Sequence, residues 1–366
     1  MTPEPSNRSI AEPRVRGHDP YALHRIALGA LLERRLPGRS ESGETADVAE
    51  FATFLYRQHL QAAWMRLIEQ DGASPEHQPL AEHLREAAKA WALLELPQQR
   101  LMTEAHRILD TAGIDYFFAK GAHLRHVIYD DPLERSAIDI DLFVKESDRD
   151  RAIALFQQAS FETHPLAETI SHELKLTRHN GDIDLHWQLF RPGRLRPGVM
   201  DWLFSRRERF GEFWGLDDTA SLFVMLVHPA ITKYLLSPTS MLIHQVDQAR
   251  LIGRGRVDWK ELESIFERSG TRTAAWASLY VLRTLAGVQA PENIEETLRP
   301  GRIRRGYLRQ WIDRAWITRW FERRWLVAGL FSLALQDTAS DAVRALRSLR
   351  RERGSEPPRM GENQAT

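Results

Sequence analysis

The sequence contains no cysteine. Disulfides, thiolate catalysis and zinc sites built on Cys are therefore excluded. The chain also has no net charge, because 50 Lys and Arg residues balance 50 Asp and Glu residues. No overall field favours a polyanionic partner, so we do not expect a nucleic-acid partner. The longest apolar runs, Ser221–Val227 and Trp325–Leu335, fall well short of the roughly 20 residues that a transmembrane helix needs, and we expect no membrane span.

Composition divides the chain of 366 residues into five parts. The first part is polar and Pro-rich and lacks the apolar segment of a signal peptide. Together with the absence of Cys, this is consistent with the cytoplasm, where we expect the protein. We expect a disordered lead-in, an N-terminal helical region, an α/β core, a C-terminal helical domain and a disordered tail, at residues 1–20, 21–110, 111–214, 215–352 and 353–366.

The N-terminal helical region shows apolar residues at helical spacing, for example Leu84, Trp91 and Leu94, and a further helix is expected at Gln99–Thr111. Residues 38–45 have the composition of a linker. No charge constellation stands out in this region. We interpret it as a helical cap on the core, and the alternative is a surface that binds an acceptor substrate.

The core begins where the period of the pattern changes. Ile114–Ala119 is short, apolar and aromatic, as a buried strand would be, and a helix is expected at Ala122–Tyr129. Residues Ile138–Val144 alternate strictly, which predicts a strand. Asn180-Gly181 predicts a hairpin whose second strand is Asp182–Trp187. The fold class that follows is α+β, a small mixed β-sheet flanked by N- and C-terminal helical regions.

Two carboxylates share one face of the alternating strand. Asp139 and Asp141 lie two residues apart, opposite an apolar face. Two like charges this close are costly unless a cation neutralises them, and hard oxygen ligands select Mg²⁺ or Mn²⁺. Asp184 or Asp182 on the hairpin can supply a third carboxylate. The alternative is that the two aspartates line the solvent face of an edge strand.

The segment before these carboxylates suits a phosphate. Lys120-Gly121 stands between the first strand and its helix, where free backbone N–H groups and the positive end of the helix dipole lie. Lys120 can supply a point charge to a triphosphate, and Arg135 is a second candidate phosphate clamp. The segment is neither a Walker P-loop nor a Rossmann fingerprint, because GxxxxGK[ST] and GxGxxG are both absent.

Three short motifs follow one another in the core: Lys120-Gly121, Asp139-Ile140-Asp141-Leu142 and Asp184-Leu185-His186-Trp187. Together they resemble the uncharacterised bacterial nucleotidyltransferase family of the polymerase-β-like superfamily. The resemblance covers roughly residues 105–290. It implies that Gly121 forms the turn that grips the triphosphate of an NTP such as ATP, that Asp139 and Asp141 bind the metal ions, and that Asp184 binds metal or activates the acceptor. The sequence departs from the usual Gly-Ser turn, because Ala122 follows Gly121.

Histidines are abundant around this core. His186 shares the face of Asp184, so it is a candidate to line the site. His123 and His126 lack an HExxH context and are interpreted as surface or packing residues. His228, followed by Pro229, is interpreted as the end of a helix.

The segment Arg302–Trp325 carries eight arginines, two acidic residues and four tryptophans. Arginines interleaved with aromatics can stack on nucleotides, dock an acidic partner or form an interfacial amphipathic helix. The interpretation that we favour is structural: Trp311, Trp316 and Trp320 belong to the core and the arginines cover the outside.

The function that we expect is metal-dependent transfer of an NMP group from an NTP to an unidentified acceptor, with release of pyrophosphate. Asp139, Asp141 and Asp184 are the expected catalytic and metal-binding residues, with Mg²⁺ (or Mn²⁺) as the cofactor. The acceptor can be a small molecule, a peptide or a protein. The alternatives are a non-catalytic NTP-binding or scaffolding protein that acts through a partner, and a protein that binds its partner through Arg302–Trp325.

Overall fold

The computed structural model describes residues 19–37, 47–72, 74–164, 173–178, 181–191, 193–237 and 240–354. The expected linker at 38–45 lies outside the described residues, as do all but the last two residues of the expected lead-in and all but the first two of the expected tail. Residues 353 and 354 form the end of a helix rather than part of a disordered tail.

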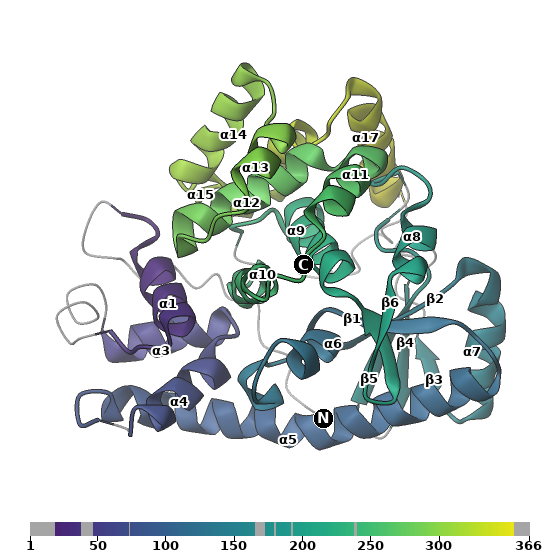
Figure 1. Ribbon diagram of the computed structural model, residues 1–366, viewed down its shortest axis with the longest axis horizontal. Helices are drawn as coiled ribbons and strands as arrows, with labels where there is room; N and C mark the ends of the chain where they lie inside the picture. The colour runs from purple at the N-terminus through teal and green to yellow at the C-terminus, as the bar shows by residue number, and fades with distance from the viewer. Residues whose placement is uncertain are drawn as a thin grey trace, which may run out of the picture.

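A five-stranded mixed sheet forms the centre of the core, which confirms the expected α+β fold (Figure 1). Its order is β1-β2-β5-β4-β3, in which β2 and β5 run parallel and the other neighbours run antiparallel. The expected hairpin is present as the β4–β5 pair. The strands are β1 (Tyr116–Ala119), β2 (Ile140–Val144), β3 (Glu162–His164), β4 (Glu173–Arg178) and β5 (Gly181–His186).

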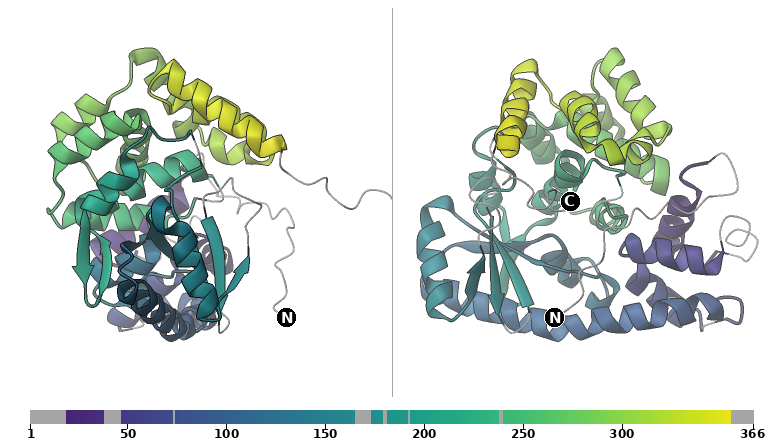
Figure 2. Two further views of the ribbon diagram at one scale, coloured as in Figure 1. Left: turned by 90° about the vertical axis from the view of Figure 1, so that its right-hand side faces the viewer. Right: turned by 180° about the vertical axis from the view of Figure 1, so that it is seen from behind.

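The sheet is covered on both faces. Alternate residues such as Phe118, Leu142 and Leu185 form one core, with the second half of α5 (Gln78–Thr111) and with α7 (Arg149–Gln158). Phe117 and Phe143 point the other way and join the core of the helical regions. The face of the sheet that carries Phe117 and Phe143 therefore meets the C-terminal helices, which lie on the opposite side of the sheet from α5 (Figures 1 and 2).

The N-terminal helices meet the core through one long helix. The 34 residues of α5 run beneath both the N-terminal helices and the sheet (Figure 1). This helix continues through Pro97, so the separate helix expected at Gln99–Thr111 is part of it. Leu94 is 42% exposed, contrary to its expected place in the core. The other N-terminal helices are α1 (Ala22–Glu33), α3 (Val48–Arg57) and α4 (Gln61–Gln70).

Shorter elements connect the strands. Helix α6 begins at Lys120, two residues earlier than expected, and ends at Val127. A two-stranded hairpin of β6 (Arg207–Phe210) and β7 (Phe213–Leu216) was not expected from the sequence, and β7 packs beside β1. The 3₁₀ turns are η1 (Pro132–Glu134), η2 (Glu146–Asp148) and η3 (Phe321–Arg323), and η4 (Ala328–Ser332) is a π-helical turn.

The C-terminal region is helical throughout the residues that the structure describes. Its helices lie above the sheet, with α17 across the end of the molecule (Figure 2). None of the described helices is both long and apolar enough to cross a membrane. The helices are α8 (Val199–Ser205), α9 (Asp218–Lys233), α10 (Ile243–Gly253), α11 (Trp259–Ser269), α12 (Arg272–Ala286), α13 (Glu292–Leu298), α14 (Arg302–Asp313), α15 (Trp316–Arg319), α16 (Arg324–Val327) and α17 (Ala339–Gly354).

Helix α9 does not end at His228, as the sequence predicted, but continues through Pro229 to Lys233. A proline inside a helix lacks the N–H that would bond the carbonyl four residues earlier. That carbonyl, on Met225, instead accepts a hydrogen bond of 2.7 Å from Nε2 of Gln248 on α10. A neighbouring helix therefore satisfies the backbone group that Pro229 leaves free.

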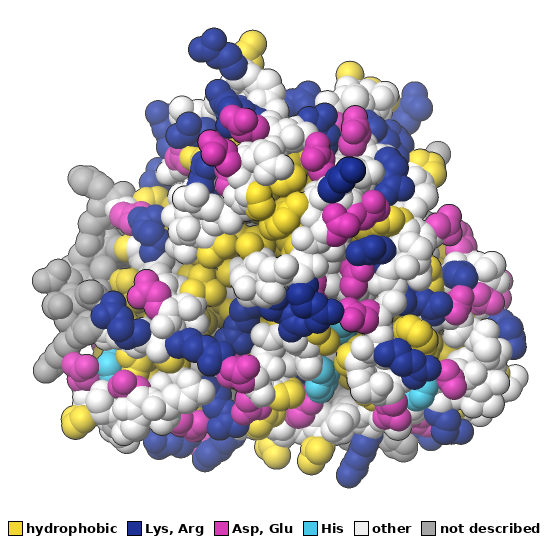
Figure 3. Space-filling view, viewed as in Figure 1, with side chains coloured by type: hydrophobic (Ala, Val, Ile, Leu, Met, Phe, Trp, Pro, Cys, Tyr) yellow, Lys and Arg dark blue, Asp and Glu magenta, His cyan; other side chains and the backbone are white. Residues whose placement is uncertain are grey.

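The arginine- and tryptophan-rich segment is partly core, as expected. Trp311 is fully buried, and Trp316, which is half-buried, stacks on Trp320 with ring centroids 5.5 Å apart. Trp320 was expected in the core but is 40% exposed, because it caps Trp316 at the edge of the cluster, and Trp325 is 65% exposed. Figure 3 shows basic and acidic side chains interspersed over one face of the molecule, in keeping with its balanced composition.

Candidate active site

The turn between β1 and α6 is built tightly. Ala119 is extended, with φ −132° and ψ 178°, and Lys120 then adopts a left-handed φ of 50°, which is uncommon for a residue other than Gly, Asn or Asp. A Cβ on Gly121 would lie 3.0 Å from Cβ of Ala137 and 3.2 Å from Nη1 of Arg135. Glycine at this position therefore allows the start of α6 to pack against the loop that precedes β2.

Three aspartates reach one cleft, two from adjacent strands and one from the residue before β2. In the register of the sheet Asp141 of β2 is paired with Ala119 of β1 on one side and with Asp184 of β5 on the other, so the side chains of Asp141 and Asp184 point to the same face. Asp139 precedes β2 and is exposed. All three line a cleft of about 280 Å³.

The strand itself is shorter than the alternation predicted. It begins at Ile140, and Ile138 is 57% exposed and lines the cleft rather than packing into the core. The alternation of residues 140–144 is confirmed, because Ile140, Leu142 and Val144 belong to the core beneath the sheet. Asp139 therefore stands at the entrance to β2 instead of within it.

Asp141 is the most enclosed of the three carboxylates. Its Oδ1 lies 2.6 Å from Nζ of Lys120 and 3.1 Å from Nε2 of His186. Burial raises the pKa of Asp141, but the Lys120 ammonium and the His186 ring outweigh burial and hold the pKa below its ordinary value. Nδ1 of His186 lies 3.4 Å from Oε2 of Glu173 on β4, so His186 lies between two carboxylates.

The pKa values of the other two carboxylates, Asp139 and Asp184, are raised. The charge on Asp141 raises the pKa of Asp139. Burial, and next the charge on Asp139, raise the pKa of Asp184 from 3.8 to about 6. Oδ1 of Asp184 is buried and has no hydrogen-bond partner, a condition that costs free energy. An incoming positive charge would relieve both effects.

The donor set matches a hard divalent cation in its chemistry, since all three groups are carboxylates that converge on one cleft. Among the described residues, however, no three His, Asp or Glu side chains stand close enough together to hold a metal ion as they are placed here. The ammonium of Lys120 is the cation that contacts Asp141 in this arrangement.

Arg135 does not extend into the cleft as a free cation. Its Nη2 lies 2.8 Å from Oδ2 of Asp247 on α10, its Nε lies 3.1 Å from both oxygens of that carboxylate, and both side chains are buried. The hydroxyl of Tyr129 donates to the same carboxylate at 2.6 Å. Arg135 contributes to the cleft wall, but its guanidinium is engaged in holding the loop to α10. The phosphate-clamp role remains a prediction that this pairing does not favour.

The helices form the opposite wall of the cleft, which the sequence did not predict. Its members are His59, between α3 and α4, His228 and Lys233 of α9, and His244 of α10. Burial lowers the pKa of His59 to about 4 and lowers the pKa of His228 and His244 well below the ordinary value. At neutral pH these histidines are uncharged, and Lys233 supplies the ammonium of this wall.

One signal for this wall was present in the sequence. His228 is the polar residue that follows the apolar run Ser221–Val227, and in the structure the helix continues past it. A polar side chain within a buried helix calls for a cavity or a partner. His123, by contrast, packs as expected: its ring lies against Gly215, where an added Cβ would clash.

A match to a family model agrees with the resemblance seen in the sequence. No curated protein matches the chain. Among solved structures, the solution structure of the antibiotic-resistance factor ANT(2'')-Ia is similar over 46% of this chain and 91% of its own, with 11% identity and a TM-score of 0.33. Residues 44–287, two thirds of the chain, match the family described as "Uncharacterised nucleotidyltransferase", and the chain therefore belongs to that family.

Proposed function

We propose that this protein transfers an NMP group from an NTP to an acceptor and releases pyrophosphate. Membership of a nucleotidyltransferase family supports group transfer in general. The observation that carries the specific proposal is the pairing of Asp141 with Asp184 across two parallel strands, beside Asp139 and in one cleft. Carboxylates are brought together in this way, at a cost in like-charge repulsion, where a cation is to be held.

In this proposal Asp139, Asp141 and Asp184 hold Mg²⁺ or Mn²⁺. A bound ion of this kind supplies neutralising charge to the α-phosphate and activates the acceptor oxygen. Alternatively, Asp184 accepts the proton of the acceptor hydroxyl instead of holding the second ion, and its raised pKa of about 6 in the free protein suits that role.

The triphosphate is bound between the two walls. The N–H groups at the start of α6 and the ammonium of Lys120 face it from one side, and Lys233 faces it from α9. Asp141 would help to hold the metal ion, and Lys120, which now contacts Asp141, would then be able to turn to the phosphates. Arg135 acts indirectly, since its bond to Asp247 fixes the loop against which Gly121 packs.

Thermal stabilisation of the protein by each NTP, with Mg²⁺, with Mn²⁺ and with EDTA, tests this proposal. A ligand at about 100 times its Kd stabilises a protein by roughly 2.7 kcal/mol. Wild type should be stabilised only when metal and nucleotide are both present, and Asp139→Asn should lose the effect.

Asp182→Asn is the matched control. Asp182 lies two residues from Asp184 on the same strand and face, but it bonds Lys175 and Thr177 and does not line the cleft. It should keep the stabilisation. A metal-dependent effect that survives in Asp139→Asn would show that the triphosphate does not bind at these carboxylates.

A non-catalytic NTP-binding protein is the second candidate. Two observations favour it: Ala122 stands where a Ser is usual, and Lys120 pairs with Asp141 in the free protein. Release of pyrophosphate separates the two. A protein that binds the NTP with metal, but releases no pyrophosphate with any hydroxyl acceptor or with water, would be a binding protein.

A further inference from the structure

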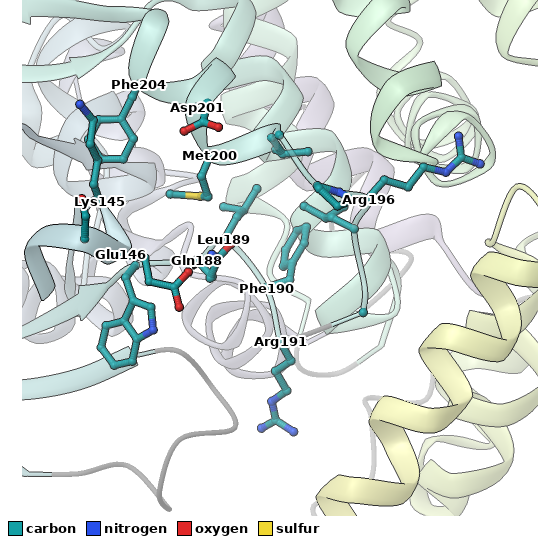
Figure 4. Close-up of a pocket in the computed structure, with 17 residues that line it drawn as sticks. Lys145, Glu146, Gln188, Leu189, Phe190, Arg191, Arg196, Met200, Asp201 and Phe204 are labelled. Carbon is teal, nitrogen blue, oxygen red and sulfur yellow. Dashed lines mark hydrogen bonds between the residues drawn. The ribbon is translucent and has the colours of Figure 1, made fainter.

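A second cavity lies beside the carboxylate cleft and is the larger of the two, with about 510 Å³ against about 280 Å³. It is bounded by the segment that follows β2 and begins at Lys145, by the segment that follows β5 and begins at Trp187, and by α8 (Figure 4). Sites for small molecules usually enclose about 300–1,000 Å³. Nucleotidyl transfer brings two substrates together, and the cleft that takes the triphosphate has little room for the second.

The two spaces meet at a pair of stacked aromatic rings. Phe190 lines the second cavity and stacks on His228, which lines the cleft, with centroids 5.8 Å apart. His186 of the cleft is followed directly by Trp187 of the cavity. The second cavity therefore adjoins the cleft at the Phe190–His228 pair and at the end of β5.

The lining of this cavity is mainly apolar. Figure 4 shows the side chain of Met200 reaching across it, whereas Arg191 and Arg196 point away. Arg196 is bound to Asp341 at 2.7 Å, and Lys145 is bound to Asp115 at 2.6 Å. The apolar residues that line the cavity are Trp187, Leu189, Phe190, Leu195, Pro197, Val199, Met200 and Phe204.

The acidic groups of the lining have little compensation. Glu146 accepts a hydrogen bond of 3.0 Å from the amide of Gln188, and the carboxylate of Asp201 is exposed. Lys145 and Arg196 already have carboxylate partners, and Arg191 points away from the cavity (Figure 4). The carboxylates of Glu146 and Asp201 therefore make the cavity unfavourable for a phosphate or another anion. An uncharged or cationic molecule with an apolar body suits it.

On the basis of the proposed nucleotidyl transfer, we propose that this second cavity binds the acceptor, and that the acceptor is an uncharged or cationic alcohol with an apolar or aromatic body. A strand rises about 3.3 Å per residue, which places Trp187 roughly 10 Å from Asp184 along β5. The hydroxyl of the acceptor therefore lies about that distance from its apolar or aromatic body.

The transfer step balances with this acceptor. The hydroxyl oxygen forms a bond to the α-phosphorus of the NTP, and the bond from that phosphorus to the oxygen of pyrophosphate breaks. The hydroxyl proton passes to the carboxylate of Asp184. The products are a phosphodiester that joins the acceptor to the nucleoside, and pyrophosphate.

Titration calorimetry of the whole protein with 6-phenylhexan-1-ol tests whether the cavity binds such an alcohol. Wild type should bind this alcohol, and Met200→Trp, which fills the space, should weaken binding at least tenfold. Met200→Lys is a second variant, because a charge on this half-buried side chain should also expel the alcohol without demanding extra volume. Met65→Trp is the control, since Met65 is half-buried in a groove on α4 and should not matter.

Nucleotide binding by the same variants separates this inference from the proposed function. NTP stabilisation with metal should be unchanged in Met200→Trp, and transfer of label from an α-labelled NTP to 6-phenylhexan-1-ol should fall with the binding of the alcohol. Loss of NTP stabilisation in Met200→Trp would assign the cavity to the nucleoside and overturn the inference. Equal binding of the alcohol by wild type and both Met200 variants, or no binding to wild type, would overturn it too. Failure of wild type to bind any NTP would instead refute the proposed function.

Discussion

Asp184→Asn should make the free protein more stable while it abolishes transfer. In the absence of metal the cleft holds the carboxylates of Asp139, Asp141 and Asp184. Of these three, Lys120 contacts only Asp141. One oxygen of Asp184 is also buried without a hydrogen-bond partner. An amide at position 184 removes a charge from this cluster at almost constant volume. A site that is stabilised when a functional group is removed is typical of strain kept for activity.

The size of the effect follows from the pKa of Asp184. The rise from 3.8 to about 6 corresponds to about 3 kcal/mol, at about 1.36 kcal/mol for each tenfold change in proton affinity. Because the side chain is only half-buried, solvent screening reduces this to about 1–1.5 kcal/mol.

The sign of the pH dependence is fixed by the direction of the shift. The folded protein binds the proton more tightly than the unfolded chain, so wild type loses stability as the pH rises from about 4 to about 6. The variant lacks this loss. Its advantage should be full at pH 7.5 and about a third of that value at pH 4.5.

Urea unfolding of both proteins in EDTA at these two pH values measures the difference. Asp182→Asn is again the control, and weakening of its half-buried contacts with Lys175 and Thr177 should change stability by less than about 1 kcal/mol. The reasoning is refuted should Asp184→Asn be no more stable than wild type at pH 7.5. With metal bound, the added positive charge lowers the pKa of Asp184, so transfer by wild type should fall only at a pH below about 6.

Three other substitutions give distinct outcomes. Lys120→Met should weaken NTP binding about tenfold, about 1.4 kcal/mol by calorimetry, and tighter NTP binding would show that the lysine serves only the carboxylates. Arg135→Met should cost about 3–5 kcal/mol in urea unfolding because it leaves Asp247 buried without its charged partner; a cost below 1 kcal/mol would contradict a holding role. Gly121→Ala should cost about 1–3 kcal/mol because the methyl group meets the loop before β2, whereas Gly253→Ala, with open space around it, should be neutral or stabilising. Equal stability of the two alanine variants would refute the packing account.

The part of the site that could be predicted from the sequence is the part built by local periodicity. Alternation along Ile140–Val144 places Asp141 opposite the core whatever lies around it. The Asn-Gly pair likewise predicts the β4–β5 hairpin, and the hairpin places Asp184 and His186 on one face. The pairing of β5 with β2 cannot be read from either segment alone, because register between distant strands depends on tertiary packing.

The helical wall could not be predicted for the same reason. His59 precedes Asp139 by 80 residues, and His228 and His244 follow Asp141 by 87 and 103 residues, so no spacing rule connects them. Arg135 shows the opposite failure. Its position before the strand suggested a free cation, but Asp247, more than 100 residues away, takes up its charge. The family match reaches back to residue 44 and includes the turn that carries His59, although that region carried no charge pattern.

Helix α10 has a consequence for how the molecule opens. Within one buried stretch, His244 faces the cleft, Asp247 holds Arg135, and Gln248 bonds the carbonyl that Pro229 leaves free on α9. Backbone amides of this stretch exchange with solvent only when all three attachments are released together. Slow hydrogen exchange in α10 should therefore report on the whole cleft. A ligand seated there should retard exchange in α9 and in the Arg135 loop as well, because α10 is bonded to both.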